Sequence, residues 1–243
     1  MQTKETYPEL ISLAVHEFRS PAGVVGGYLR MLQRDTDESL TPRHRKLIDE
    51  AAKSCARFSQ IVEELSAVGK LDDGRIPMER KPVDLFRLVD EVAELVHEAR
   101  EREVFLTVSG PSIGAPMLGD AKLLRQSLDG VFRAIVREKP RHSTVVVERR
   151  IEKTNDGPAA ILIVAEANSV QAAYDREPGP FLYTPRGGVG LALAIARRVI
   201  EGLGGRLWAP LPAEGLPEHG LMPQDALARG SAIISLPITE SAR

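Results

Sequence analysis

The chain has 243 residues, of which 43% are hydrophobic and 27% charged, and a formal net charge of -2. This composition is that of a globular chain, and the balanced charge excludes a global field that would draw it to nucleic acid or anionic lipid. Its single cysteine, Cys55, excludes an internal disulfide and favours a reducing compartment, so we expect a cytoplasmic protein. The longest apolar run, residues 159–165, is far shorter than the roughly 20 residues that cross a bilayer, so we expect no membrane insertion.

Helical periodicity alone marks residues 1–70, which we take as the first domain. Two apolar stripes recur every three or four positions and predict two long helices joined by a loop at 35–43. Thr41 is the expected N-cap of the second helix, Pro42 its first residue and Gly69 its end. Because two helices bury little alone, we expect an antiparallel hairpin that forms a four-helix bundle as a parallel homodimer. The stripes are Leu10, Ala14, Phe18, Pro21, Val25, Tyr28 and Leu32, then Ile48, Ala51, Cys55, Phe58, Val62 and Leu65.

A polar segment broken by Gly and Pro, residues 71–82, predicts a linker to a second domain at 83–243. Helices are expected at 84–99, 120–135 and 190–203. Strands are expected at 104–108, 117–118, 144–151, 160–165, 206–209 and 231–238. An irregular stretch separates residue 165 from the third helix, and residues 210–230, with four prolines, predict a long loop. The chain is therefore of α+β class, with the helices of its second domain expected on one face of a mixed sheet.

His16 lies two residues after Ala14, about 200 degrees around the helix, so its imidazole should face water. Arg19 and Ser20 share that face. An exposed histidine on a helix is usually an ordinary surface residue. Here it begins the run HEFRSP, and a neutral imidazole near pH 7 is a nucleophile that can hold a phosphoryl group covalently.

This run, within LAVHEFRSPAGVVGGYLRML, resembles the phosphoacceptor box of two-component sensor histidine kinases, and the resemblance continues into KPVDLFRLVDEVAELV. It implies that His16 is the phosphorylated histidine. Adjacent Glu17 would accept the imidazole proton or hold the ring, and Ser20 stands where the family often has Thr or Asn to orient a hydrolytic water. The resemblance also implies a partner, the receiver domain of a response regulator, whose aspartate exchanges the phosphoryl group with His16.

The second domain resembles the ATP-binding domain of these kinases, a two-layer α/β sandwich called the GHKL or Bergerat fold. The run GGVGLALAIARRVIEGLGGRLW is similar to the family's glycine-rich box. The resemblance implies that Gly187, Gly188 and Gly190 offer backbone amides to nucleotide phosphates at a helix N-terminus. It also implies that Glu166 can accept a hydrogen bond from an adenine amino group.

Other parts of the nucleotide site depart from the family pattern. Gly130 and Ala134 fall where two asparagines belong, and an alanine methyl cannot be one of the oxygen ligands that Mg²⁺ needs. In the box that normally reads Asp, any residue, Gly, any residue, Gly, the chain has Glu166, Asn168 and Val170, and we expect Val170 to crowd the base pocket. We therefore expect no metal site and no cofactor, with ATP and Mg²⁺ bound only if the altered site still functions.

The leading hypothesis is a two-component signal transduction protein that carries a phosphoryl group on His16, similar to stand-alone histidine phosphotransferases. One alternative is an ATP-dependent sensor histidine autokinase, and another is a pseudokinase scaffold that binds receiver domains and transfers nothing. The intact HEFRSP run argues against the scaffold, whereas Ala134 and Val170 argue against the autokinase.

Overall fold

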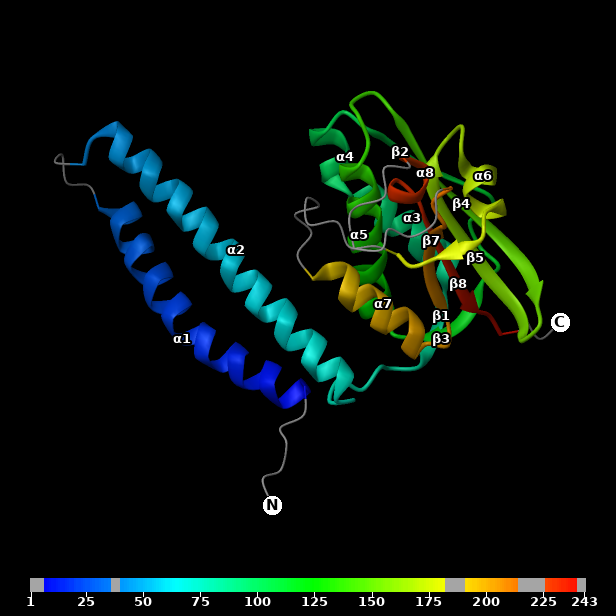
Figure 1. Cartoon of the computed structure of the whole chain (residues 1–243), viewed down its shortest axis with the longest axis horizontal. Coiled ribbons are helices and arrows are strands. Elements are labelled where there is room, and N and C mark those ends of the chain that lie inside the picture. Colours follow the sequence, from blue (N-terminus) through cyan, green and yellow to red (C-terminus); the bar gives the residue numbers. More distant parts are fainter. Residues whose placement is uncertain (1–6, 36–39, 182–190, 214–225, 240–243) are drawn as a thin grey trace, which may run out of the picture. The chain divides into compact units, whose positions relative to one another are not determined.

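A computed structural model describes residues 7–35, 40–181, 191–213 and 226–239 (Figure 1). The chain divides into two compact units, Met1–Ile76 and Pro77–Arg243. In the ranges given above, no helix combines the length and the apolar character that a membrane span requires.

The first unit is a hairpin of two long helices, α1 (Tyr7–Arg34) and α2 (Pro42–Asp72) (Figure 1). Thr41 caps α2 as expected, because its hydroxyl accepts a hydrogen bond of 3.3 Å from the backbone N–H of His44. The expected helix end at Gly69 is wrong: Gly69 is buried inside α2. The helix ends one turn later, where Gly74 adopts a left-handed φ of 66° that favours glycine.

Packing between α1 and α2 uses a stripe shifted by one position from the one expected on α1. Ile11 and Val15 are buried against Val62, with half-buried Leu65 beside them. A shift of one residue turns a side chain by about 100 degrees, so most of the expected stripe remains uncovered in a single copy. These exposed residues are Leu10, Phe18, Val25, Tyr28 and Leu32.

The second unit is built on a mixed six-stranded sheet with the order β2-β4-β5-β8-β7-β6. Among the strands that the structure describes in this sheet, β2 and β4 form the only parallel pair. A separate antiparallel pair, β1 and β3, lies outside this sheet. The strands are β1 (Lys81–Asp84), β2 (Phe105–Ser109), β3 (Pro116–Gly119), β4 (Thr144–Thr154), β5 (Gly157–Glu166), β6 (Pro178–Gly179), β7 (Arg206–Pro210) and β8 (Ala232–Pro237).

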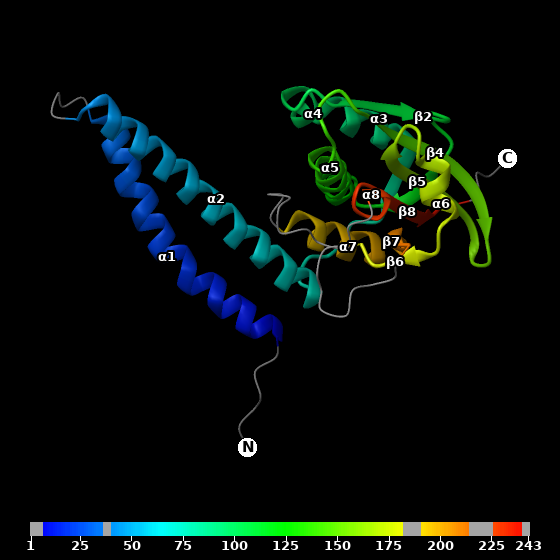
Figure 2. The ribbon, with the colours of Figure 1, turned by 45° about the horizontal axis from the view of Figure 1, so that its top comes forward.

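Three amphipathic helices cover one face of this sheet, α3 (Leu85–Leu95), α5 (Ala121–Arg137) and α7 (Ala192–Gly202) (Figure 2). Asp84 and Asp120 cap α3 and α5 by accepting hydrogen bonds from backbone N–H groups of the first turn. The helix expected to run to residue 99 is interrupted at Val96, after which the short α4 (His97–Glu101) begins. Apolar side chains of these helices and of the strands beneath them form the main core.

The opposite face of the sheet is covered too, contrary to the expectation of helices on one face only. The short helices α6 (Val170–Asp175) and α8 (Ala226–Arg229) contribute side chains to a second buried cluster with β5 and β8. The physical reason is that β5 is an unbroken apolar strand, so both of its faces need to be shielded from water. The stretch after residue 165, which was expected to be irregular, contains α6 and β6.

Candidate functional site

His16 lies in the first half of α1, and its side chain is 84% exposed. The expected exposure is thus confirmed. The Nδ1 atom lies 3.4 Å from Oε1 of Glu17, which is also exposed. Because a carboxylate can only accept a hydrogen bond, this contact favours the tautomer with the proton on Nδ1. The lone pair of Nε2 is then directed toward solvent and is available as a nucleophile.

Ser20 is four residues beyond His16 and is exposed on the same side of α1. Pro21 follows it inside the helix, which continues to Arg34. Because proline has no N–H, the carbonyl of Glu17 lacks its helical hydrogen-bond donor. The structure thus brings His16, Glu17 and Ser20 together within about one helical turn on a solvent-facing surface.

The glycine-rich run of the second unit, with Gly187, Gly188 and Gly190, lies outside the described residues. The helix after it, α7, begins at Ala192 and packs closely against Gly130 of α5. A Cβ atom added at Gly130 would lie 3.1 Å from the Cβ of Ala192. An asparagine at this position would therefore require Ala192 to shift by a few tenths of an ångström.

Ala134, one turn further along α5, is buried and offers only a methyl group. Neither Gly130 nor Ala134 has a side-chain oxygen atom, so these two side chains do not fit the hard oxygen coordination of Mg²⁺. In the part of the chain that the structure describes, no group of three His, Cys, Asp or Glu side chains is arranged to hold a metal ion.

Glu166 ends β5, and its Oε2 atom accepts a hydrogen bond of 3.3 Å from Nζ of Lys139. The Lys139 side chain is only 7% exposed. The expectation that Val170 crowds the base pocket is wrong, because its side chain is buried in the cluster on the opposite face of the sheet. Sequence reasoning missed Lys139, and nothing in its local pattern distinguishes it from an ordinary surface lysine.

Comparisons with known proteins agree with this arrangement. Residues 9–74 match the His Kinase A (phospho-acceptor) domain. Sensor protein FixL of Bradyrhizobium diazoefficiens is 27% identical over 216 residues, which cover 85% of this chain and 41% of FixL. The probable sensor histidine kinase TcrY of Mycobacterium tuberculosis is 28% identical over 207 residues, covering 82% of this chain and 42% of TcrY. The chain thus spans less than half the length of these relatives.

Solved structures show the same fold at low sequence identity. Full-length ShkA, crystallised in complex with AMPPNP, has a TM-score of 0.66 at 23% identity, covering 98% of this chain and 47% of ShkA. Histidine kinase ThkA, in complex with response regulator protein TrrA, has a TM-score of 0.55 at 18% identity, covering 97% of this chain and 63% of ThkA.

The structure combines a helical hairpin that carries an exposed histidine with an α/β unit, and solved histidine kinases share this fold. Residues 9–74 match the phospho-acceptor domain of histidine kinases, and most of the chain is similar to sensor histidine kinases.

Proposed function

We propose that this chain carries a phosphoryl group on His16 and exchanges it with an aspartate of a response-regulator receiver domain. The observation that carries the proposal is the exposed His16 inside a phospho-acceptor domain, with Glu17 at its Nδ1 atom. The complex of the related fold ThkA with response regulator TrrA supports a partner of this class. The single cysteine suits a cytoplasmic place of action.

The transfer requires only groups that the site and its partner provide. The lone pair of Nε2 attacks the phosphorus of an aspartyl phosphate, the bond from phosphorus to the carboxylate oxygen breaks, and the aspartate leaves as an anion. Glu17 stabilises the positive charge that develops on the ring and holds the Nδ1 proton. Ser20 orients a water molecule for hydrolysis of the phosphohistidine. The same steps in reverse return the phosphoryl group to the receiver.

The exposed apolar residues of α1 support a homodimer. Leu10, Phe18, Val25 and Tyr28 are large side chains that the hairpin leaves in water. A second copy that packs its own hairpin against them would complete a four-helix bundle and cover these side chains. His16 lies away from the buried seam of Ile11 and Val15, so a receiver can approach it.

The phosphoryl source in this proposal is a phosphorylated receiver, because Gly130 and Ala134 offer no metal ligand. The second candidate is an ATP-dependent autokinase, which the glycine-rich run containing Gly187, Gly188 and Gly190 favours. The two candidates differ in which donor labels His16.

The deciding experiment incubates the full chain with radiolabelled ATP and, separately, with a radiolabelled phosphorylated receiver. We expect acid-labile label from the receiver only, and none in His16→Gln. His44→Gln is the matched control, since this histidine is exposed on α2 and should leave labelling unchanged. Label from ATP that depends on His16 would establish the autokinase instead. Absence of label from both donors would refute phosphotransfer and leave the scaffold.

A titration of Mg-ATP by calorimetry tests the nucleotide site separately. We expect a dissociation constant above about 1 mM, which corresponds to less than about 4 kcal/mol of binding free energy. A micromolar constant that disappears in Gly190→Trp would contradict this expectation.

A further inference from the structure

A buried lysine follows the C-terminal end of α5. The Lys139 side chain is 7% exposed, and its backbone N–H donates to the carbonyl of Val136 at 3.2 Å. Burying an ammonium group is costly unless a charged partner compensates for the lost hydration. Within the described residues, the partner is Glu166, whose Oε2 lies 3.3 Å from Nζ. This Lys139–Glu166 pair joins the end of α5 to the end of β5.

The position of Glu166 connects this ion pair with nucleotide binding. Glu166 ends β5 at the place where the family resemblance puts the carboxylate that accepts a hydrogen bond from an adenine amino group. In this chain, the ammonium of Lys139 is already a donor to that carboxylate. A base that took over the Oε2 atom of Glu166 would have to displace Lys139, which would leave a buried ammonium without its counterion. A base at the other carboxylate oxygen would meet a group whose charge Lys139 already compensates.

A second contact, within α5, points the same way. Gly130 packs against Ala192 so closely that an added Cβ would lie 3.1 Å from the alanine Cβ. The start of α7 is thus seated directly on α5 where the family pattern has an asparagine. The two contacts lie at different places, one inside α5 and one after its C-terminal end, and depend on different residues.

We propose that Lys139 is a positioning residue that holds Glu166 as an internal counterion and so competes with adenine nucleotides for this carboxylate. This inference rests on the proposed function, in which the phosphoryl group comes from a receiver and the second unit works without nucleotide. In this proposal, the amino group of Lys139 is the hydrogen-bond donor to Glu166, in place of an adenine amino group.

The first test is competitive acetylation of the full chain with a limiting amount of acetic anhydride, with every lysine quantified by mass spectrometry. We expect Lys139 to react about tenfold more slowly than exposed Lys153, because acetylation requires local opening that frees the amine. Glu166→Gln should speed acetylation of Lys139 and leave Lys153 unchanged. Glu148→Gln is the matched control, because Glu148 pairs with Arg150 on the same sheet.

Equal rates for Lys139 and Lys153, or no effect of Glu166→Gln, would overturn the proposal. Because either variant could loosen the fold, the thermal midpoints of Lys139→Met, Glu166→Gln and the double variant form a second measurement. If the two residues act as a pair, the double variant should lose less than the sum of the single losses. Additive losses would show that they do not interact.

The nucleotide arm repeats the acetylation of the wild-type chain in millimolar ATP. We expect the rate at Lys139 to be unchanged. Protection of Lys139 that saturates with ATP would show that a nucleotide reaches the pair, and would overturn the proposal. Labelling of His16 by a phosphorylated receiver is measured on the same preparation. If that labelling fails while Lys139 stays protected by Glu166, the proposed function fails and the internal pair stands.

Discussion

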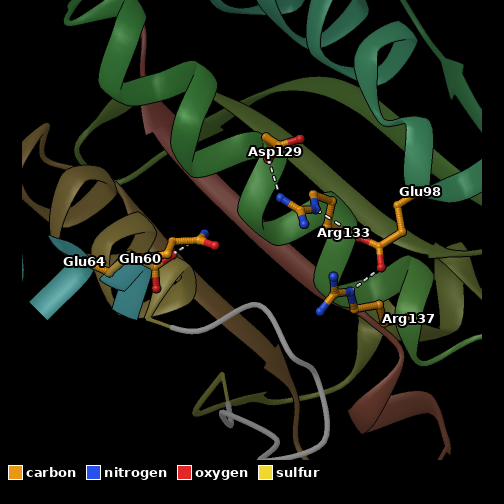
Figure 3. A network of polar contacts seen from close by, with 6 residues as sticks. All are labelled: Gln60, Glu64, Glu98, Asp129, Arg133 and Arg137. Carbon is orange, nitrogen blue, oxygen red and sulfur yellow. Dashed lines mark hydrogen bonds and ion pairs between the residues drawn. The ribbon is translucent and has the colours of Figure 1, made fainter. Parts of the chain in front are cut away.

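The ion network between α4 and α5 provides a sharp test of how charge stabilises the second unit. The carboxylate of Glu98 on α4 accepts hydrogen bonds from the Nε atoms of Arg137 and of Arg133, the latter at 2.9 Å (Figure 3). Arg133 also pairs with Asp129 one turn earlier on α5. Glu98 is 15% exposed, whereas Arg133 is 38% exposed. The network is thus shielded at its centre and open to water on one side.

Two opposing effects act on the pKa of Glu98. Burial raises it, but the hydrogen bonds from Arg137 and Arg133 together outweigh burial and place the pKa below its ordinary value of 4.5. A carboxylate whose pKa is lowered by folding contributes stability that is fully present above the ordinary value. This contribution is lost as the pH falls through the lowered value of the folded state.

We predict that Glu98→Gln lowers the free energy of unfolding at neutral pH by about 1 to 2 kcal/mol. The amide oxygen of glutamine can still accept one of the two hydrogen bonds, so about one hydrogen bond to a charged group is lost, and water screening at the exposed Arg133 reduces its contribution. For a unit of this size the thermal midpoint should fall by about 2 to 8 °C.

Thermal unfolding followed by circular dichroism between neutral pH and pH 3 measures both effects. The midpoint of the wild type should decline below the ordinary pKa of 4.5, and Glu98→Gln should decline less, because its side chain cannot be protonated in this range. Glu91→Gln is the control: Glu91 also meets two arginines but is 42% exposed, so its loss should cost little. Equal effects of the two substitutions at neutral pH would refute the reasoning.

Three further substitutions test the hairpin and the second unit. Phe58→Glu should split the proposed dimer, because it places a charge among apolar side chains. Light scattering that shows the wild type as a monomer at micromolar concentration would contradict the bundle. Asp120→Ala removes an N-cap with two hydrogen bonds of 3.0 Å and should cost about 1 to 2 kcal/mol in urea unfolding, with Asp120→Asn costing less. Gly202→Ala would place a Cβ 2.1 Å from the Met78 Cε, so we expect faster proteolysis after residue 76. Adding Met78→Ala removes the clashing atom and should reduce this effect.

Features that depend on neighbours in the chain could be predicted from the sequence. The cap at Thr41 forms through a hydrogen bond to a residue three positions away, and the caps at Asp84 and Asp120 are equally local. The exposure of His16 followed from helical period alone. Even so, the period could not specify which of two adjacent apolar stripes of α1 faces α2, because both fit a helix and only packing distinguishes them.

Features that depend on distant partners were decided by the tertiary structure. Arg149 lies on the same face of β4 as the buried Val145 and Val147. Its buried guanidinium donates to the carbonyls of Phe86 and Gly110 and pairs with Asp90. Lys139 is likewise buried because β5 brings Glu166 to it. A charged side chain is stable inside a protein only when its partners converge on it from other elements. The sequence by itself determined the helices, most strands and the exposed histidine, whereas long-range packing decided which polar groups the core could accept.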